Sequence, residues 1–359
     1  MFSGTAVALV FSSYLVLEPV FRTERVFQKV TAAGGDAWER FVGPDWLVEF
    51  ATAVEWPPVS KLLMRVEHVT LLGPLANDEL LMEILDESDP EELFLENVAV
   101  TDRGLAALAN ETELRELAIG ECQVTDDGLR HLKELGNLTD LMLYDLPITD
   151  RGMELVADLS NLEFLALHNL RVTDIGLERI AACQHLENLS LVGIDIEADV
   201  FSHLASLPSL RVVSLTDVGL SDLGMQTLCH LPHLVGLWLW DVRLEAKSLR
   251  HVASCRPLRI LMLEGTTVSD NHLVHLSRSP RVTRLQLSES NVTDAGLAHL
   301  SKLPNLEWLG LRETNVTDAG LPHLYGHSRL LRLDASGAQV TKKGLGELQR
   351  YLPSVDFSE

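Results

Sequence analysis

The stretch VTDRGLAAL at residues 100–108 decides the fold, because variants of it return every 24 residues. With its threonine as the anchor, the repeated position is occupied by Thr101, Thr125, Thr149, Thr173, Glu197, Ser221, Glu245, Ser269, Thr293, Thr317 and Thr341. Asn77 extends the series one step earlier, which gives twelve units without insertion or deletion, or 288 of the 359 residues. We therefore expect one repeat array rather than the two or three globular domains that the length suggests.

Each unit also carries a Leu-x-Leu pattern at a fixed distance from the first motif, as at Leu141 and Leu143. Such alternation predicts a short strand with one buried face. The Thr or Asp of Thr-Asp-x-Gly-Leu can cap a helix whose leucines are buried, and we expect the glycine to let neighbouring units approach closely. One strand and one short helix cannot bury their own apolar face, so the units must stack. Parallel strands would then line the concave face of a horseshoe, with the helices on the convex face.

At these residues, from about Val66 to the C-terminus, the chain resembles the leucine-rich-repeat superfamily. More narrowly, it is similar to the subtype with Val-Thr-Asp-x-Gly-Leu signatures, found in bacterial repeat proteins and in eukaryotic F-box substrate adaptors. The resemblance implies an α/β leucine-rich-repeat solenoid that serves as a binding surface. The superfamily usually places Asn or Cys three residues after the second strand leucine, and here only Cys122 matches. We therefore expect backbone contacts or water to satisfy the turns.

Residues 77–93 permit a rival interpretation. Asn77 to Leu85, followed by Asp89 and Pro90, looks like the core of an F-box, the helical module that docks adaptors onto ubiquitin ligases. The same residues stand in the 24-residue register, and Leu93 must begin a repeat strand. The register favours the repeat.

Composition excludes several functions. The chain has 52 acidic and 29 basic residues and a net charge of −23, which argues against nonspecific nucleic-acid binding. No phosphate loop, Gly-x-Ser-x-Gly, His-Glu-x-x-His or paired-carboxylate site stands outside the repeats, so we expect neither an enzyme nor a cofactor. A helical column of histidines lacks acidic or cysteine partners, so no metal site is predicted for His131, His203, His251, His275, His299 and His323. The four cysteines are expected to be buried thiols, with a Cys229–Cys255 bridge left open.

Residues beside the strand leucines are expected to line the concave face in three zones. The first is acidic and contains Glu92, Glu96, Glu116 and Asp140. The second is aromatic and apolar, with Phe164, Val212, Trp238, Trp240, Ile260 and Met262. The third places Trp308 beside Arg284, Arg312 and Arg332. Exposed Trp and Arg beside apolar side chains are typical of binding hot spots, so we predict a protein-binding surface centred on Trp238, Trp240, Met262 and Trp308.

The position after these zones supplies an acidic rim, formed by Glu121, Asp145, Asp217, Asp241, Glu289 and Glu313. The rim is either a solvated face or a surface that steers a basic partner. A calcium site is not expected, since a straight column lacks converging oxygens.

The two ends fall outside the repeats. Residues 1–17 carry no charge and reach the short limit of a membrane-spanning helix, and Arg22, Arg25 and Lys29 follow them. The predicted division is a hydrophobic segment and membrane anchor at 1–21, a helical cap at 22–65, the repeat domain at 66–351, and a capping strand at 352–359. The cap holds three of the six tryptophans, Trp38, Trp46 and Trp56. An exported or cleaved segment and a buried capping helix stay open as alternatives for residues 1–17.

These observations predict a membrane-tethered scaffold or recognition protein that binds a protein partner through its concave face. The alternative is a soluble cytoplasmic adaptor or inhibitor that binds a basic partner through its acidic N-terminal repeats. Lateral assembly of the chain is a third possibility.

Overall fold

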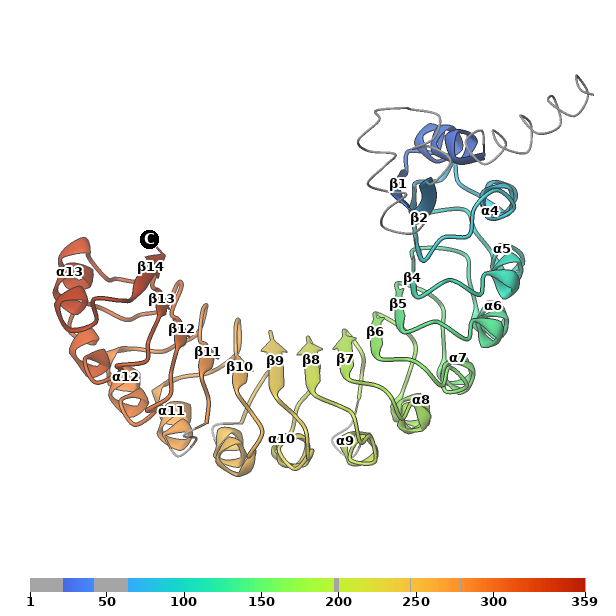
Figure 1. The fold of residues 1–359 in the computed structure, drawn as a ribbon. Coiled ribbons are helices and arrows are strands. Elements are labelled where there is room, and N and C mark those ends of the chain that lie inside the picture. The colour runs from blue at the N-terminus through green and yellow to red at the C-terminus, as the bar shows by residue number, and fades with distance from the viewer. Residues whose placement is uncertain are drawn as a thin grey trace, which may run out of the picture. The chain divides into compact units, whose positions relative to one another are not determined.

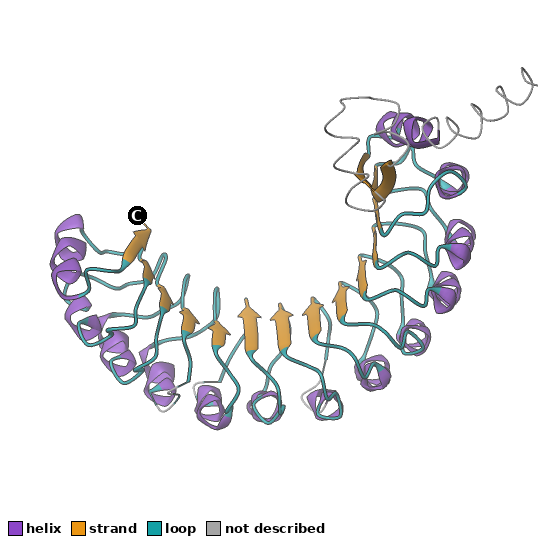
Figure 2. Cartoon of the chain, viewed as in Figure 1, coloured by secondary structure: helices purple, strands orange, loops and turns teal. Residues whose placement is uncertain are grey.

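The computed structural model describes residues 22–41, 64–196, 200–245, 247–277, 279 and 281–358. The chain divides into two compact units, Met1–Asn161 and Leu162–Glu359, which we call the N-terminal unit and the C-terminal unit. Each unit is described separately. In both, strands lie on one side and helices on the other (Figures 1 and 2).

The N-terminal unit begins with a helix over residues 22–32, which is followed by an antiparallel pair of strands, β1 (Asp36–Phe41) and β2 (Met64–Leu72). The segment expected to be a helical cap thus also contains a strand that covers the edge of the sheet. Parallel strands then follow in chain order: β3 (Glu92–Glu96), β4 (Glu116–Gly120) and β5 (Asp140–Tyr144). The helical side consists of α4 (Asp78–Leu85), α5 (Asp102–Leu105), η1 (Ala106–Asn110), α6 (Asp126–Leu129), η2 (Arg130–Glu134) and α7 (Asp150–Val156).

The C-terminal unit continues the same alternation. Its strands are β6 (Phe164–His168), β7 (Asn188–Val192), β8 (Val212–Thr216), β9 (Gly236–Trp240), β10 (Ile260–Met262), β11 (Arg284–Gln286), β12 (Trp308–Gly310), β13 (Arg332–Asp334) and β14 (Asp356–Ser358). Each strand pairs in parallel with the next. The helices are α8 (Asp174–Arg179), η3 (Ile180–Ala182), α9 (Phe201–Leu204), α10 (Asp222–Leu228), η5 (Ser248–Ser254), α11 (Asp270–Leu276), α12 (Asp294–Leu300), η6 (Leu321–Leu324) and α13 (Lys342–Tyr351).

The leucines of both patterns form the core between strands and helices. Leu93 and Leu95 of β3 are fully buried, while their neighbours Glu92, Phe94 and Glu96 are not. The helix leucines Leu105 and Leu108 are also fully buried. The alternation predicted from the sequence is confirmed, and it leaves the residues between the strand leucines on an open face.

The Thr-Asp-x-Gly motif joins neighbouring repeats. Thr341 caps α13, and its amide and hydroxyl donate to the two carboxylate oxygens of Asp318, one repeat earlier, at 2.7 and 2.6 Å. The same pair of hydrogen bonds joins Asp78 to Thr101, Asp102 to Thr125, Asp126 to Thr149, Asp270 to Thr293, and Asp294 to Thr317. We call this series the Asp–Thr ladder. Threonine is thus the helix cap, and aspartate holds the next repeat.

The glycine of the motif makes the Asp–Thr ladder possible. A Cβ atom on Gly344 would lie 2.1 Å from Oδ1 of Asp318, and one on Gly128 would lie 2.5 Å from Oδ1 of Asp102. Any side chain at these positions would displace the carboxylate that accepts the two hydrogen bonds from the threonine. The prediction that this glycine permits close approach of neighbouring units is confirmed.

The Asp–Thr ladder changes at Asp222, because the repeat that follows carries Glu245 in place of threonine. Asp222 instead accepts hydrogen bonds from Arg250 at 2.7 Å and from His251 at 3.2 Å. Ser248 replaces the glycine of that repeat, and its hydroxyl is buried without a partner among the described residues. This junction keeps its spacing but lacks the Asp–Thr hydrogen bonds described above.

One residue in the turn after each of β3 to β13 adopts the left-handed backbone conformation, directly after β3 to β9 and three residues after the end of β10 to β13. Its φ lies between 49° and 70°, at Asn97, Glu121, Asp145, Asn169, Gly193, Asp217, Asp241, Gly265, Glu289, Glu313 and Gly337. In the turns within each unit, the amide donates to a carbonyl of the next repeat, as Glu121 does to Tyr144 at 3.1 Å and Glu313 to Ser336 at 2.9 Å. These backbone contacts satisfy part of the turns, as predicted. The prediction is incomplete, because side chains three residues after the second strand leucine also contribute: Thr266 and Thr314 donate to the carbonyls of Leu263 and Leu311, both at 2.7 Å. Gly, Asn and Asp adopt this conformation at the lowest cost in free energy, whereas glutamate has no short polar side chain to stabilise it.

The four cysteines are buried and unbridged, so the Cys229–Cys255 bridge that the sequence left open is not formed. Within the described part of the chain, no helix is long and apolar enough to cross a membrane. The segment predicted as an anchor, residues 1–21, lies outside the described residues, as do Trp46 and Trp56.

Candidate protein-binding surface

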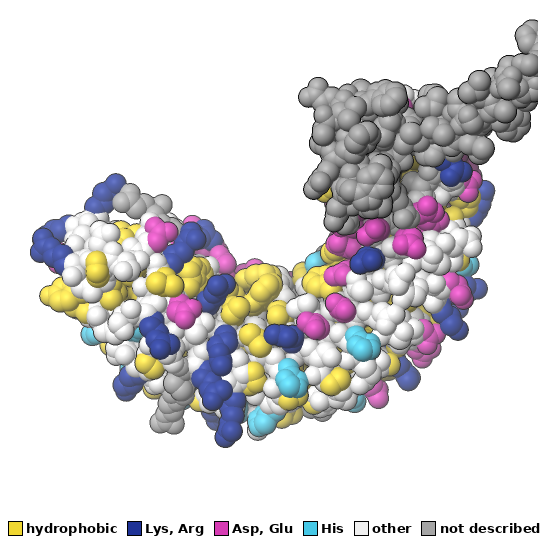
Figure 3. Space-filling view, viewed as in Figure 1, with side chains coloured by type: hydrophobic (Ala, Val, Ile, Leu, Met, Phe, Trp, Pro, Cys, Tyr) yellow, Lys and Arg dark blue, Asp and Glu magenta, His cyan; other side chains and the backbone are white. Residues whose placement is uncertain are grey.

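Strand register places the aromatic residues of the C-terminal unit together. Trp238 and Trp240 extend from β9 with ring centroids 5.7 Å apart, and Met262 of β10 lies in register with Trp238. Beside them, Ile260 is in register with Gly236. These side chains are half-buried, and hydrophobic atoms gather over β9 and β10 in the space-filling view (Figure 3). We call Trp238, Trp240, Ile260 and Met262 the aromatic patch.

The absence of a side chain at Gly236 determines the orientation of the Trp238 indole. The Trp238 Nε1 atom would be only 3.5 Å from a Cβ atom on Gly236, so the indole leans over a position that has no side chain. The Nε1 atom is buried without a hydrogen-bond partner among the described residues. The nitrogen-bearing edge of the indole is thus buried close to the backbone at Gly236, while part of the side chain stays exposed.

Phe164 is not part of this group. It is half-buried on β6 and is in register with Asn188 of β7, which is in turn in register with Val212 of β8. Three strand steps separate it from β9. The sequence placed Phe164 in the same zone, but the structure does not bring it to the two tryptophans.

Trp308 stands between two arginines further along the C-terminal unit. Arg284 of β11, Trp308 of β12 and Arg332 of β13 are in register on neighbouring strands. Both arginines are exposed, and the tryptophan is half-buried. A groove of about 430 Å³ lies here, lined by Met262, Arg284, Glu307, Trp308, Leu331 and Arg332. We call it the Trp308 groove.

Arg312, which the sequence grouped with Arg284 and Arg332, forms ion pairs within the fold. Its guanidinium pairs with Glu264 at 2.9 Å, with Glu313 at 3.1 Å, and with Glu289. These contacts, chiefly the hydrogen bond to Glu264, raise the pKa of Arg312 above its usual value. Its charge is already compensated, so it does not serve as a free cation for a partner.

Charge also separates across strands β8 to β13 of the C-terminal unit, a polarity that the three zones did not predict. Over these strands, four arginines lie at the amino ends or just before them, at Arg211, Arg259, Arg284 and Arg332, against the single carboxylate of Glu307. Before β6 and β7 the same position is acidic, at Glu163 and Glu187. Exposed carboxylates lie just beyond the carboxyl ends, at Asp217, Asp241, Glu289 and Glu313. A partner laid along these strands would meet a basic edge on one side and an acidic edge on the other.

In the N-terminal unit, the acidic zone is a row of residues in register. Glu92, Glu116 and Asp140 occupy the first positions of β3, β4 and β5. His68 of β2 extends this row, because its Nδ1 lies 2.8 Å from Glu92 and its Nε2 lies 2.6 Å from the hydroxyl of Thr70. Trp38 stacks on the imidazole with ring centroids 4.4 Å apart. We call His68, Glu92, Glu116 and Asp140 the acidic row.

Glu116 is the member of the acidic row whose ionisation is most affected by its surroundings. Burial, together with the charges of Glu92 and Asp140, raises the pKa of Glu116, and His68 partly offsets this effect. At neutral pH the Glu116 carboxylate therefore gains from a nearby cation more than an isolated surface acid would. Glu96 lies at the other end of β3, exposed, and its charge adds to burial in raising the pKa of Tyr144 to about 12.

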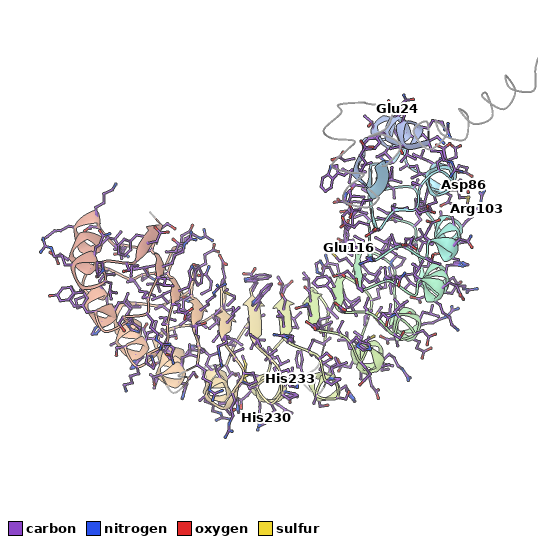
Figure 4. The ribbon with its side chains drawn as sticks, in the orientation of Figure 1. Glu24, Asp86, Arg103, Glu116, His230 and His233 are labelled. Atoms are coloured by element: carbon purple, nitrogen blue, oxygen red, sulfur yellow. The ribbon has the colours of Figure 1, made fainter. Side chains whose placement is uncertain are left out.

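Side chains on the two sides of the N-terminal unit differ in role. Glu116 lies on the strand side, and Arg103 lies on the helix side (Figure 4). Arg103 pairs with Glu79 at 3.1 Å, and Arg151 pairs with Asp127 at 2.7 Å. Such exposed pairs contribute little to stability. Their charges are matched, in contrast to the acidic row.

His230 and His233 lie on the helix side of the C-terminal unit, away from the strand face (Figure 4). Across the described ranges, no group of three or more His, Cys, Asp or Glu side chains is placed to hold a metal ion.

Sequence reasoning missed three residues of these surfaces. His68 precedes the first Thr-Asp signature, although it stands 24 residues before Glu92 and so was detectable by register. Glu307 and Leu331 directly precede the strands β12 and β13, a position that was not considered. Leu331 is 58% exposed, which is unusual for a large apolar side chain beside a groove.

The stacked strand–helix units with their buried leucines define the fold as a leucine-rich-repeat solenoid of α/β class. Among solved structures, the chain is similar to an internalin from Listeria monocytogenes, with a TM-score of 0.54 and 19% sequence identity over 88% of this chain and 94% of that one. At this identity, the likeness concerns the fold alone. No protein-family profile matches the sequence, and no curated protein matches it significantly.

Proposed function

We propose that this protein is a non-catalytic recognition protein whose strand face in the C-terminal unit binds a protein partner. The observation that carries the proposal is the aromatic patch, because repeat packing places two tryptophans side by side on a face that no other described element covers. Tryptophan is the residue type most enriched in binding hot spots. Assignment to the Val-Thr-Asp-x-Gly-Leu subtype is a prediction from the sequence.

The test compares partner capture by the wild type and by the Trp238→Ala/Trp240→Ala variant. Proteins retained from a lysate of the source cells would be quantified by mass spectrometry. A true partner is expected to fall at least tenfold, since loss of one hot-spot residue costs about 2 kcal/mol or more. Circular dichroism would verify that the variant is folded.

A matched control removes exposed apolar residues from the helix side instead. Ile175 of α8 and Leu223 of α10 are 61% and 49% exposed. The Ile175→Ala/Leu223→Ala variant is expected to capture the partner as the wild type does. Equal capture by the wild type and the tryptophan variant would refute the proposal.

A second candidate function is recognition of a basic partner by the N-terminal unit, as an adaptor or inhibitor would do. The raised pKa of Glu116 favours it, because an incoming Lys or Arg would relieve the repulsion within the acidic row. Association would then slow as salt is added. An association rate that does not depend on salt would exclude electrostatic steering.

Membrane tethering through residues 1–21 is a further proposal, supported by the uncharged sequence of residues 1–17 and the basic residues that follow. Cell fractionation tests it. Recovery of the uncleaved chain from the soluble fraction without detergent would contradict the anchor and favour the cytoplasmic alternative.

A further inference from the structure

We propose that the Trp308 groove binds an extended acidic segment of a protein, with an apolar side chain packed against Trp308 and carboxylates bound by Arg284 and Arg332. The inference rests on the proposed function of the strand face and specifies the chemistry of the bound segment.

The groove has the size and lining for an apolar side chain. Its volume of about 430 Å³ lies within the range of sites that bind small ligands. Met262 and Trp308 are half-buried, and Leu331 is 58% exposed, so all three have apolar surface that is still in contact with water. An aliphatic or aromatic side chain placed here would cover that surface.

The arginines flank this apolar site at a spacing that suits an extended chain. Arg284 and Arg332 lie in register on either side of Trp308, two strand steps apart. Two steps of a parallel sheet span about 9.6 Å. Side chains i, i+2 and i+4 of an extended peptide share one face, with i and i+4 about 13 Å apart, and the long arginine side chains can cover the difference. Acidic side chains at positions i and i+4, with an apolar side chain at i+2, would therefore face both guanidinium groups and Trp308.

The charges around the groove favour a carboxylate over a cation. The lining carries two arginines against the single carboxylate of Glu307. Arg312, on the same strand face, pairs with three glutamates and does not line the groove. Arginine binds carboxylate through paired hydrogen bonds, which gives geometric selectivity as well as attraction.

The polarity across the strands sets the position of the acidic segment. The groove includes Glu307 and Leu331, which precede β12 and β13, so it lies toward the basic edge. Glu289 and Glu313 lie beyond the opposite ends of β11 and β12 and would repel an acidic chain there. The segment is thereby confined to the amino-end side of the strands.

The experiment selects ligands without assuming a partner. A phage-displayed library of random octapeptides is panned on the full chain, and enriched peptides are synthesised and measured by fluorescence anisotropy. We expect enrichment of peptides with two Asp or Glu residues that flank an aromatic or aliphatic residue. Their affinity is expected to fall at least tenfold in Arg284→Glu, in Arg332→Glu and in Trp308→Ala.

The control Lys302→Glu changes the net charge as much as each arginine variant, but Lys302 lies in the turn after α12 and does not line the groove. It is expected to leave peptide affinity unchanged, and thermal melting would verify that every variant is folded. The inference is overturned if no peptides are enriched, if the enriched peptides lack acidic residues, or if Lys302→Glu weakens them as much as the arginine variants do.

Failure of this inference is distinguishable from failure of the proposed function. Acidic peptides should still bind the Trp238→Ala/Trp240→Ala variant within threefold of wild type, because neither tryptophan lines the groove. If that variant loses its natural partner while no acidic peptide binds the wild type, the proposed function stands and the inference about the groove is wrong.

Discussion

Gly344 and Gly346 lie two residues apart in α13, but only Gly344 stands where a side chain would collide with a neighbouring repeat. A Cβ atom on Gly344 would lie 2.1 Å from the Asp318 carboxylate, while one on Gly346 would meet nothing within 4 Å. The carboxylate cannot simply move away, because Thr341 holds both of its oxygens and keeps the pKa of Asp318 below its usual value. The same helix thus offers a matched pair of substitutions.

Gly344→Ala is expected to lower the free energy of unfolding by about 1 kcal/mol, since hydrogen bonds to an exposed carboxylate are lost. Gly346→Ala is expected to raise it by about 0.5–1 kcal/mol, because alanine loses less backbone entropy than glycine in a helix. Urea denaturation of the two variants and the wild type measures both changes. Equal effects of the two substitutions would show that the Asp–Thr ladder does not require the glycine.

At the scale of the element, the acidic row on β3, β4 and β5 links stability to pH. Because the folded-state pKa of Glu116 is raised, the folded chain binds this proton more tightly than the unfolded chain does. The group therefore lowers the free energy of unfolding as the pH rises from its unfolded pKa through its folded pKa. The loss persists at neutral pH.

Glu116→Gln is accordingly expected to raise the melting temperature at pH 7. The gain should disappear as the pH falls below about 4.3, where the carboxyl group is protonated in both states of the wild type. Differential scanning calorimetry from pH 3.5 to 7.5 provides the measurement. Glu134→Gln, on η2, removes the same charge from the helix side. A gain of equal size there would indicate a general charge effect rather than the acidic row.

Strands and helices were predictable because their signals are local and repeated. The positions of Leu93 and Leu95 followed from alternation, and the spacing of Thr341 from Asp318 followed from the register. The ion pairs of Arg312 could not be predicted in this way. Its contacts with Glu264 and Glu289 depend on the direction that long side chains take after the repeats stack. The sequence also did not predict the separation of charge across the strands. To find it, residues just before each strand, such as Arg211 and Arg259, must be placed on the same face as the strand residues.

At the scale of the whole molecule, the net charge of −23 acts against compactness. Raising the NaCl concentration from about 10 to about 150 mM shortens the screening length from about 30 to about 8 Å. Exposed ion pairs such as Arg103–Glu79 are weakened by the same salt, but each contributes only about 0–1 kcal/mol. Relief of repulsion should therefore dominate.

The melting temperature is expected to rise with NaCl over this range, as calorimetry would record. Sodium chloride is preferable to a sulfate, because sulfate stabilises proteins through exclusion from their surface. A melting temperature that falls as NaCl is added would mean that the ion pairs, rather than the excess of acids, govern the electrostatics of this chain.

The Asp–Thr ladder has a consequence for how such a chain changes length over generations. Each aspartate reaches only the threonine one repeat onward, and the glycine that admits it stands three residues after that threonine. A duplication of 24 consecutive residues within these repeats would supply one new donor and one new acceptor, each facing a partner of the expected kind. A unit can therefore be copied or deleted by a single recombination event without any compensating mutation, whereas a copy one residue longer or shorter would misalign the contact at its own junction.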